Sequence, residues 1–180
     1  AAGVKNFVLQ RAGVADFTVV NAYTYNPAGV IGYSDPDAWL AAAGLPEARW
    51  NLAAATLSNR LYAIGGYDAD SSSRDTVYGF DGTNWTVETS LPGALAEIGA
   101  TSDGTNIWLA GDASGVGGSA GVLTFDGASW TSIENLSVAR SWPVMAVFSN
   151  RPVVISGSVP NVTEYDGSSW NERAPLPGGA

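Results

Sequence analysis

The chain contains no cysteine and no histidine among its 180 residues. Their absence excludes disulfides, thiol nucleophiles, zinc fingers and every histidine-based general base, including the Ser-His-Asp triad. A bound metal would have to be a hard cation held by oxygen atoms, and no cofactor is expected. Charge is scarce as well, because only 14% of the residues are charged, with 8 Lys+Arg against 17 Asp+Glu. So few cations argue against nucleic-acid binding, which needs clustered positive side chains.

Long apolar runs are also missing. The longest, such as residues 39–43, fall far short of the ~18 residues that a membrane-spanning helix needs, so no membrane partner is expected. Hydrophobic residues nevertheless make up 46% of the chain. Together with the low charge, this content predicts a well-packed globular protein rather than a disordered one.

What the chain does contain is an internal repeat. Residues 77–85, VYGFDGTNW, return as residues 122–130 and 162–170, and a degenerate copy occupies residues 30–39. Each copy ends in a tryptophan, and a leucine stands six residues after each tryptophan. The tryptophans are Trp39, Trp85, Trp130 and Trp170, and the leucines are Leu45, Leu91, Leu136 and Leu176. The tryptophans are separated by 46, 45 and 40 residues, so the repeat has a period of about 45 residues.

A second pattern precedes each copy. Two short runs of β-branched, aromatic or small apolar residues flank a tight turn at Ser58-Asn59, Asp103-Gly104 and Ser149-Asn150. In the first repeat, residues 4–9 and 17–20 supply the corresponding runs in divergent form. Each repeat therefore predicts four antiparallel strands, which we call a, b, c and d. Such a unit, repeated around a circle, is the signature of a β-propeller. We predict an all-β fold of four blades, at residues 1–45, 46–93, 94–139 and 140–180.

The second repeat carries the most specific motifs. Residues 46–49 (PEAR), then 61–66 (LYAIGG), Tyr78 and Trp85 resemble the Kelch repeat, with its diglycine and its downstream Tyr and Trp. The resemblance covers residues 46–180 well and residues 1–45 weakly. It implies a Kelch-type β-propeller with strand a nearest the axis and the repeated tryptophan packed between blades. Copper oxidases of the galactose-oxidase type also use such blades, but their cysteine and histidine ligands are absent here.

The end of the sequence bears on how the ring closes. Residues 176–178 (LPG) repeat residues 91–93, after which another strand a should begin. Three arrangements would complete the ring: four blades that close tightly, several chains that form one ring as a homo-oligomer, or a longer native chain. We expect a longer native chain, because an exposed blade edge needs covering.

Strand alternation places the b–c loops and the d–a connections on one rim, which we call the b–c rim. The b–c loops at residues 67–75 and 112–119 are long and differ from each other, as binding loops on a rigid scaffold do. The candidate binding residues on this rim are Arg49, Trp50, Asp68, Asp70, Arg74, Arg140 and Trp142. Structural roles remain open for the two arginines that follow strand d, and packing remains open for the two tryptophans.

Two aspartate patterns have alternative interpretations. Residues 68–72 have the oxygen spacing with which a calcium loop begins, but Ser73 and Gly79 replace its sixth-position glycine and its distal glutamate, so no metal site is predicted. The aspartates of the c–d turns, Asp81, Asp126 and Asp166, are interpreted as residues that cap their own turns.

These patterns predict a non-enzymatic binding module. The repeat style resembles virion appendage proteins of bacteriophages and bacterial surface Kelch proteins, which implies a virion, cell-surface or extracellular location. It also implies a protein or glycan ligand on the b–c rim and other virion or surface proteins as neighbours. The alternatives are a carbohydrate-active enzyme and an intracellular Kelch adaptor for protein–protein interaction.

Overall fold

The computed structural model describes residues 7–9, 17–19, 42–111 and 120–177. Regular structure in these residues is entirely β, so this part of the chain has no helix able to cross a membrane. The chain divides into two units, residues 1–41 and 42–180. In the first unit, β1 (Phe7–Leu9) pairs antiparallel with β2 (Phe17–Val19). These are the two strands expected from residues 4–9 and 17–20, whereas the expected strands around Trp39 lie outside the described residues.

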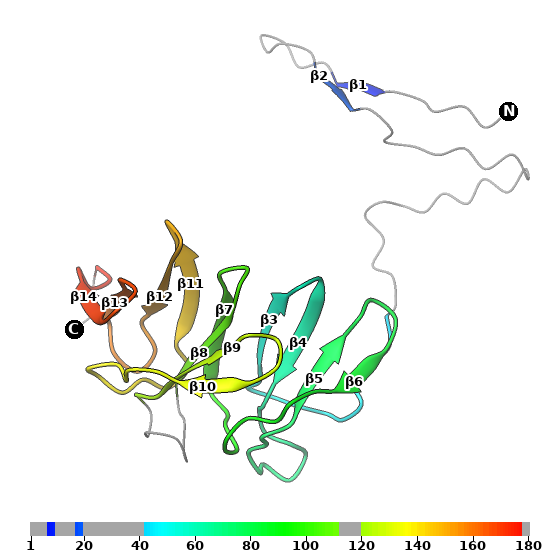
Figure 1. The fold of residues 1–180 in the computed structure, drawn as a ribbon, viewed down its shortest axis with the longest axis horizontal. Helices are drawn as coiled ribbons and strands as arrows, with labels where there is room; N and C mark the ends of the chain where they lie inside the picture. Colours follow the sequence, from blue (N-terminus) through cyan, green and yellow to red (C-terminus); the bar gives the residue numbers. More distant parts are fainter. Residues whose placement is uncertain (1–6, 10–16, 20–41, 112–119, 178–180) are drawn as a thin grey trace, which may run out of the picture. The chain divides into compact units, whose positions relative to one another are not determined.

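The second unit consists of three four-stranded antiparallel sheets, each with its strands in sequence order (Figure 1). The second blade contains β3 (Ala53–Leu57), β4 (Arg60–Ile64), β5 (Val77–Phe80) and β6 (Trp85–Val87). The third blade contains β7 (Ile98–Ser102), β8 (Ile107–Gly111), β9 (Val122–Phe125) and β10 (Trp130–Ser132). The fourth blade contains β11 (Val144–Phe148), β12 (Arg151–Ile155), β13 (Val162–Tyr165) and β14 (Trp170–Arg173). Each sheet lies inside one of the repeat ranges expected from the sequence.

In two blades the a–b turn is formed by the two residues that the sequence predicts. Ser58 and Asn59 have φ values of 51° and 61°, and Ser149 and Asn150 have φ values of 50° and 62°. Two consecutive positive φ values define the type I′ turn that suits a two-residue β-hairpin. In the third blade the turn is longer and spans residues 103–106. The Asp103 carboxylate stabilises it by accepting the backbone N–H groups of Thr105 and Asn106, each at 2.7 Å.

Two apolar cores lie between successive blades. Strands β3, β7 and β11 follow one another across Figure 1, as expected for the strands nearest the axis. The core between the second and third blades includes Leu57, Ile64, Val77, Leu109 and Phe125. The core between the third and fourth blades includes Trp108, Ala110, Val122, Met145 and Val154. The blades are therefore held together by sheet faces packed on each other rather than by strand pairing.

The repeated tryptophans connect neighbouring blades, as the repeat predicts. The indole N–H of Trp130 donates to the Thr89 carbonyl at 3.0 Å, and that of Trp170 donates to the Glu134 carbonyl at 3.0 Å. Trp85 makes the same bond to the Ala43 carbonyl at 2.9 Å. Thr89 follows β6 and Glu134 follows β10, and Ala43 stands at the equivalent sequence position, four residues after Trp39. Every described blade thus bonds to the segment before it through one indole.

The diglycine of the second blade allows a close approach between blades. Gly65 and Gly66 have φ values of 60° and 86°, and the N–H of Gly66 donates to the Leu95 carbonyl at 2.8 Å. A Cβ atom on Gly65 would lie 2.5 Å from that carbonyl oxygen. A larger residue would therefore strain the backbone and separate the second blade from the third.

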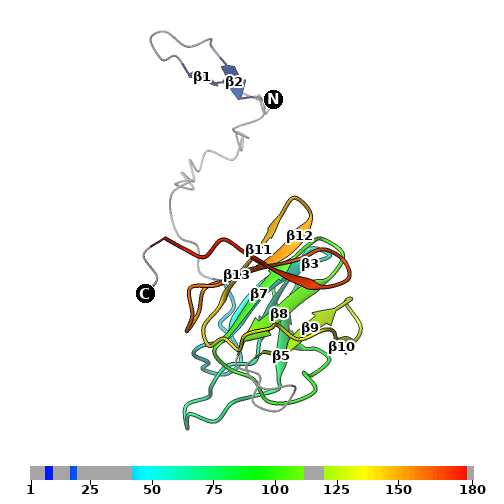
Figure 2. The ribbon, with the colours of Figure 1, turned by 90° about the vertical axis from the view of Figure 1, so that its left-hand side faces the viewer.

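The fourth blade leaves one sheet face uncovered. By alignment of the repeats, Phe148 occupies the position of Leu57, yet Leu57 is 3% exposed and Phe148 is 72% exposed. Val144 and Leu176 are exposed in the same way, although Leu91 and Leu136, which correspond to Leu176, are buried. Figure 2 views the molecule from the side of this blade. Leu57 lies on the face with which the second blade packs against the third. In the described chain, nothing covers the corresponding face of the fourth blade.

Candidate functional site

Three residues at equivalent positions of the repeat, one in each described blade, are joined by backbone hydrogen bonds on the b–c rim. Asn51, Glu97 and Trp142 stand shortly before strand a of their blades, and their φ values are 51°, 58° and 52°. The N–H of Glu97 donates to the Asn51 carbonyl at 3.1 Å, and the N–H of Trp142 donates to the Glu97 carbonyl at 3.0 Å. The three residues therefore form a short hydrogen-bonded series that crosses from blade to blade.

Trp142 is the unusual member of this series. Asparagine tolerates the left-handed region, whereas a bulky side chain there carries backbone strain. The side chain of Trp142 is also 59% exposed, so it gains little from packing. Strain of this kind concentrates at binding sites, where the surrounding structure holds a residue in place for a purpose other than stability.

Trp50 is the second exposed tryptophan of the rim, and three contacts hold it. Its ring packs on Tyr67, with centroids 4.5 Å apart, and its indole N–H donates to the Asp68 carbonyl at 3.0 Å. Its backbone forms a β-bridge with Tyr67. Trp50 remains 47% exposed. The hydroxyl of Tyr67 donates to Glu97 Oε1 at 3.2 Å, which places a carboxylate beside the aromatic pair.

The loop of residues 67–75 is organised by Asp68. One carboxylate oxygen accepts the N–H groups of Asp70 and Ser72, each at 2.9 Å, and the other accepts a bond from Arg74. The Ser72 bond is the main reason why the pKa of Asp68 is lowered, with Arg74 adding to the effect. Asp68 is buried, and its carboxylate is fully used within the loop. The described residues contain no group of three potential metal ligands.

The structure places the side chains of Arg49 and Arg140 inside the protein, which is a correction to their proposed role at the rim surface. Arg140 is completely buried and donates to the carbonyls of Val154 and Asn161, at 3.2 and 2.7 Å, and to the Thr163 hydroxyl. The side chain of Arg49 is 2% exposed and pairs with Glu47 at 2.8 Å. Their position after strand d suggested the rim, but both side chains turn inward: Arg140 bonds to interior oxygens, and the Arg49 guanidinium lies over the Tyr78 ring, 5.9 Å from its centroid.

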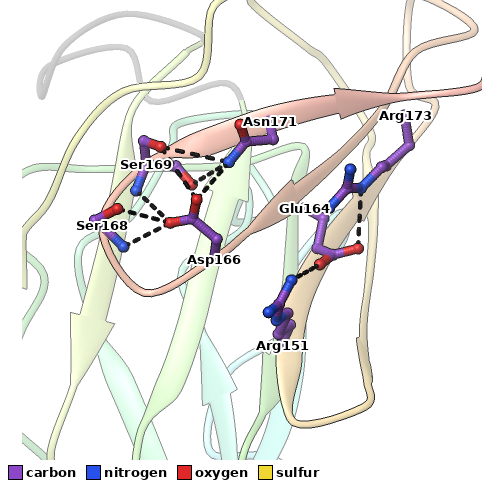
Figure 3. A network of polar contacts seen from close by, with 7 residues as sticks. All are labelled: Arg151, Glu164, Asp166, Ser168, Ser169, Asn171 and Arg173. Atoms are coloured by element: carbon purple, nitrogen blue, oxygen red, sulfur yellow. Dashed lines mark hydrogen bonds and ion pairs between the residues drawn. The ribbon is translucent and has the colours of Figure 1, made fainter.

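All six arginines of the described residues form ion pairs, and Arg140 pairs with Glu172 at 3.8 Å. Besides the two buried ones, Arg60 pairs with Glu88 at 2.8 Å, and Arg74 pairs with Asp68. Arg151 and Arg173 bind the same carboxylate, Glu164, at 2.7 and 3.1 Å, as Figure 3 shows. The bonds from Arg173 and then Arg151 lower the pKa of Glu164. Each of these arginines is therefore already paired with a carboxylate, and none is left unpaired to bind an anionic ligand.

The c–d turns lie on the opposite rim, and their aspartates cap them as predicted. Asp166 accepts the N–H groups of Ser168 and Ser169, at 2.8 and 2.9 Å, and its pKa is lowered mainly by the Ser169 bond (Figure 3). Asp81 and Asp126 do the same in the other two blades. Ionised carboxylates bonded within their own turns do not suit a general acid, which needs a raised pKa.

Two hollows also lie on this opposite rim. The larger, of about 710 Å³, is bordered by Ser58, Arg60 and Asp81, and the smaller, of about 290 Å³, is bordered by Asp103 and Arg151. Asp103 is occupied by the indole of Trp108, at 2.7 Å, and by its own turn. Burial raises the pKa of Asp103, but these bonds outweigh burial and lower it. The hollows therefore hold no unengaged acid for catalysis.

Of the seven residues proposed for the rim, the structure brings together Trp50, Asp68 and Arg74 through direct contacts. Asp70 is exposed in the same loop, and Trp142 is linked through Glu97. Tyr67 and Glu97 complete the site, although the sequence did not single them out. The available signal for Glu97 was its alignment with Asn51 and Trp142 in the repeat.

The three sheets and their inter-blade tryptophans give the described part of the chain the fold of Kelch-type β-propeller blades. The chain is 31% identical over 129 residues to Kelch repeat protein M-T8 of Myxoma virus (strain Lausanne), covering 67% of this chain and 25% of that protein. The Kelch resemblance noted in the sequence is thereby confirmed.

Among solved structures, that of YjhT matches with a TM-score of 0.60 at 15% sequence identity. This match covers 76% of this chain and 49% of the YjhT chain, and at such identity it shows the fold alone. The chain therefore spans about a quarter of the curated relative and about half of the solved one. No protein-family model matches the chain.

Proposed function

We propose that this chain is a non-enzymatic binding module that holds a macromolecular ligand on its b–c rim. The observation that carries the proposal is the pair of exposed tryptophans, Trp50 and Trp142: the Trp50 ring is held by Tyr67 and Asp68, the Trp142 backbone is bonded to Glu97, and neither side chain is buried. Tryptophans of this kind dominate the energetics of binding surfaces. Every described carboxylate with a shifted pKa is shifted downward, which supports binding over acid catalysis.

We further propose that the module works on a virion appendage or a bacterial surface, with protein or glycan as its ligand. The support is the acidic, cysteine-free and Gly-, Ser- and Thr-rich repeat style of the sequence. Because a fold does not determine a function, association with particles is the required test. Recovery of the protein in purified virions or surface fractions is expected, and copurification with a cytosolic ligase complex would contradict this setting.

The binding proposal is tested on peptide and glycan arrays. The wild type is compared with Trp50→Ala and with Val87→Ala, which removes an exposed apolar side chain from strand β6 instead. Array signals of the wild type are expected to disappear in the first variant and to persist in the second. Unchanged signals in Trp50→Ala would refute the rim site. Turnover of a bound glycan that stops when one carboxylate is changed to its amide would show an enzyme.

A further inference from the structure

The chemistry of the b–c rim indicates what kind of ligand it takes. Trp50, Tyr67, Glu97 and Trp142 form one continuous arrangement through a ring contact, a side-chain hydrogen bond and a backbone hydrogen bond. It combines two exposed indoles with a carboxylate whose position is held by the Tyr67 hydroxyl. Aromatic faces beside a carboxylate attract cations, because the ring quadrupole and the negative charge act in the same direction.

The distribution of charge around this arrangement points the same way. The described residues contain 13 acidic and six basic side chains, and all six basic ones are engaged in ion pairs. On the rim itself, Asp70 and Asp75 are exposed in the same loop as Tyr67. The nearest exposed cation in that loop, Arg74, is bound by Asp68. An acidic ligand would find carboxylates here and no unpaired guanidinium to bind it.

Resting on the proposed function, we infer that the rim site binds a lysine- or arginine-bearing segment of a partner protein. A basic side chain of the partner packs against the Trp142 and Trp50 rings, and its charge is balanced by Glu97. The net charge of −9 then assists association, since complementary charge increases encounter rates. The positive φ of Trp142 and its backbone bond to Glu97 fix the main chain from which the exposed indole projects, so this main chain needs no ordering on binding.

The test uses the full chain and three labelled probes in fluorescence anisotropy at physiological salt: a lysine–glycine hexapeptide, its glutamate–glycine counterpart, and neutral maltohexaose. Trp142→Asn is the central variant, because asparagine occupies the equivalent Asn51 position with φ 51° and tolerates that backbone. We expect the lysine peptide to bind the wild type and to bind Trp142→Asn about tenfold more weakly, with unfolding temperature maintained.

The charge is tested separately with Glu97→Gln, which should weaken binding of the lysine peptide about three- to tenfold. Glu134→Gln is the matched control, because it removes one exposed carboxylate of the same rim, in the connection after β10, that is not part of the arrangement of Trp50, Tyr67, Glu97 and Trp142; it should change affinity by less than about twofold. Equal losses in Glu97→Gln and Glu134→Gln would mean non-specific attraction and would overturn the inference.

The outcomes separate this inference from the proposed function. Trp142-dependent binding of the glutamate peptide or of maltohexaose would overturn the basic-segment inference and leave the binding rim standing. A wild type that does not bind the lysine peptide would also overturn the inference. Loss of array signals in Trp50→Ala would in that case still support the rim as the binding surface.

Discussion

The uncovered face of the fourth blade leads to a comparison between two equivalent residues. Leu57 and Phe148 both end strand a of their blades, but one is 3% exposed and the other 72%. Replacing a buried leucine with alanine removes its transfer free energy and leaves a cavity, which costs about 3 kcal/mol. Replacing an exposed residue changes stability by less than about 0.5 kcal/mol. We expect Leu57→Ala to destabilise strongly and Phe148→Ala to be nearly neutral.

Urea unfolding, followed by both tryptophan fluorescence and far-UV circular dichroism, measures the difference. With a denaturant dependence of about 2 kcal/mol per molar urea, the midpoint of Leu57→Ala should fall by about 1.5 M. The midpoint of Phe148→Ala should stay within about 0.3 M of the wild type. The reasoning is refuted if both variants lose the same stability, because Phe148 would then be covered in solution. A midpoint that rises with protein concentration would identify a second copy as the cover.

Three further predictions concern the interior and the turns. Trp130→Phe keeps the aromatic packing but loses the hydrogen bond to the Thr89 carbonyl. Thermal unfolding should therefore show a free energy of unfolding about 1 kcal/mol lower, and an unchanged value would mean that this bond does not stabilise the contact between blades. Arg140→Met leaves interior carbonyls unpaired and should cost about 3 kcal/mol in urea titrations, whereas an unchanged midpoint would argue against its structural role. The pKa of Asp126 is lowered mainly by the Ser129 N–H, so its stabilisation is present above the unfolded pKa of about 3.9 and is lost as the pH falls through the folded pKa. Asp126→Asn should therefore flatten the acid limb of a stability–pH curve, and an unchanged limb would contradict this.

Much of the fold could be predicted because a repeat reports the same structure several times. The period, the turn residues and the tryptophan that ends each copy were sufficient for the strands of three blades and for the contacts of Trp85, Trp130 and Trp170. The site was harder to predict, since binding residues are the ones that differ between repeats.

Two features of the site depend on contacts that spacing alone does not reveal. Arg140 follows strand d like a rim residue, but its side chain is long enough to reach carbonyls 14 and 21 residues away, and those bonds determine its burial. Glu97 meets Tyr67 across a separation of 30 residues at positions that are not equivalent in the repeat. The positive φ of Trp142 runs against the preference of its residue type, so no propensity predicts it.

The backbone series from Asn51 through Glu97 to Trp142 also determines how the blades depend on each other. Each of its bonds joins one blade only to the blade before it, and the indole bonds of Trp130 and Trp170 do the same. The array therefore behaves as a one-dimensional chain with nearest-neighbour coupling, in which stability is a sum of blade terms and interface terms. Damage to one interface between the described blades therefore weakens the array locally rather than as a whole.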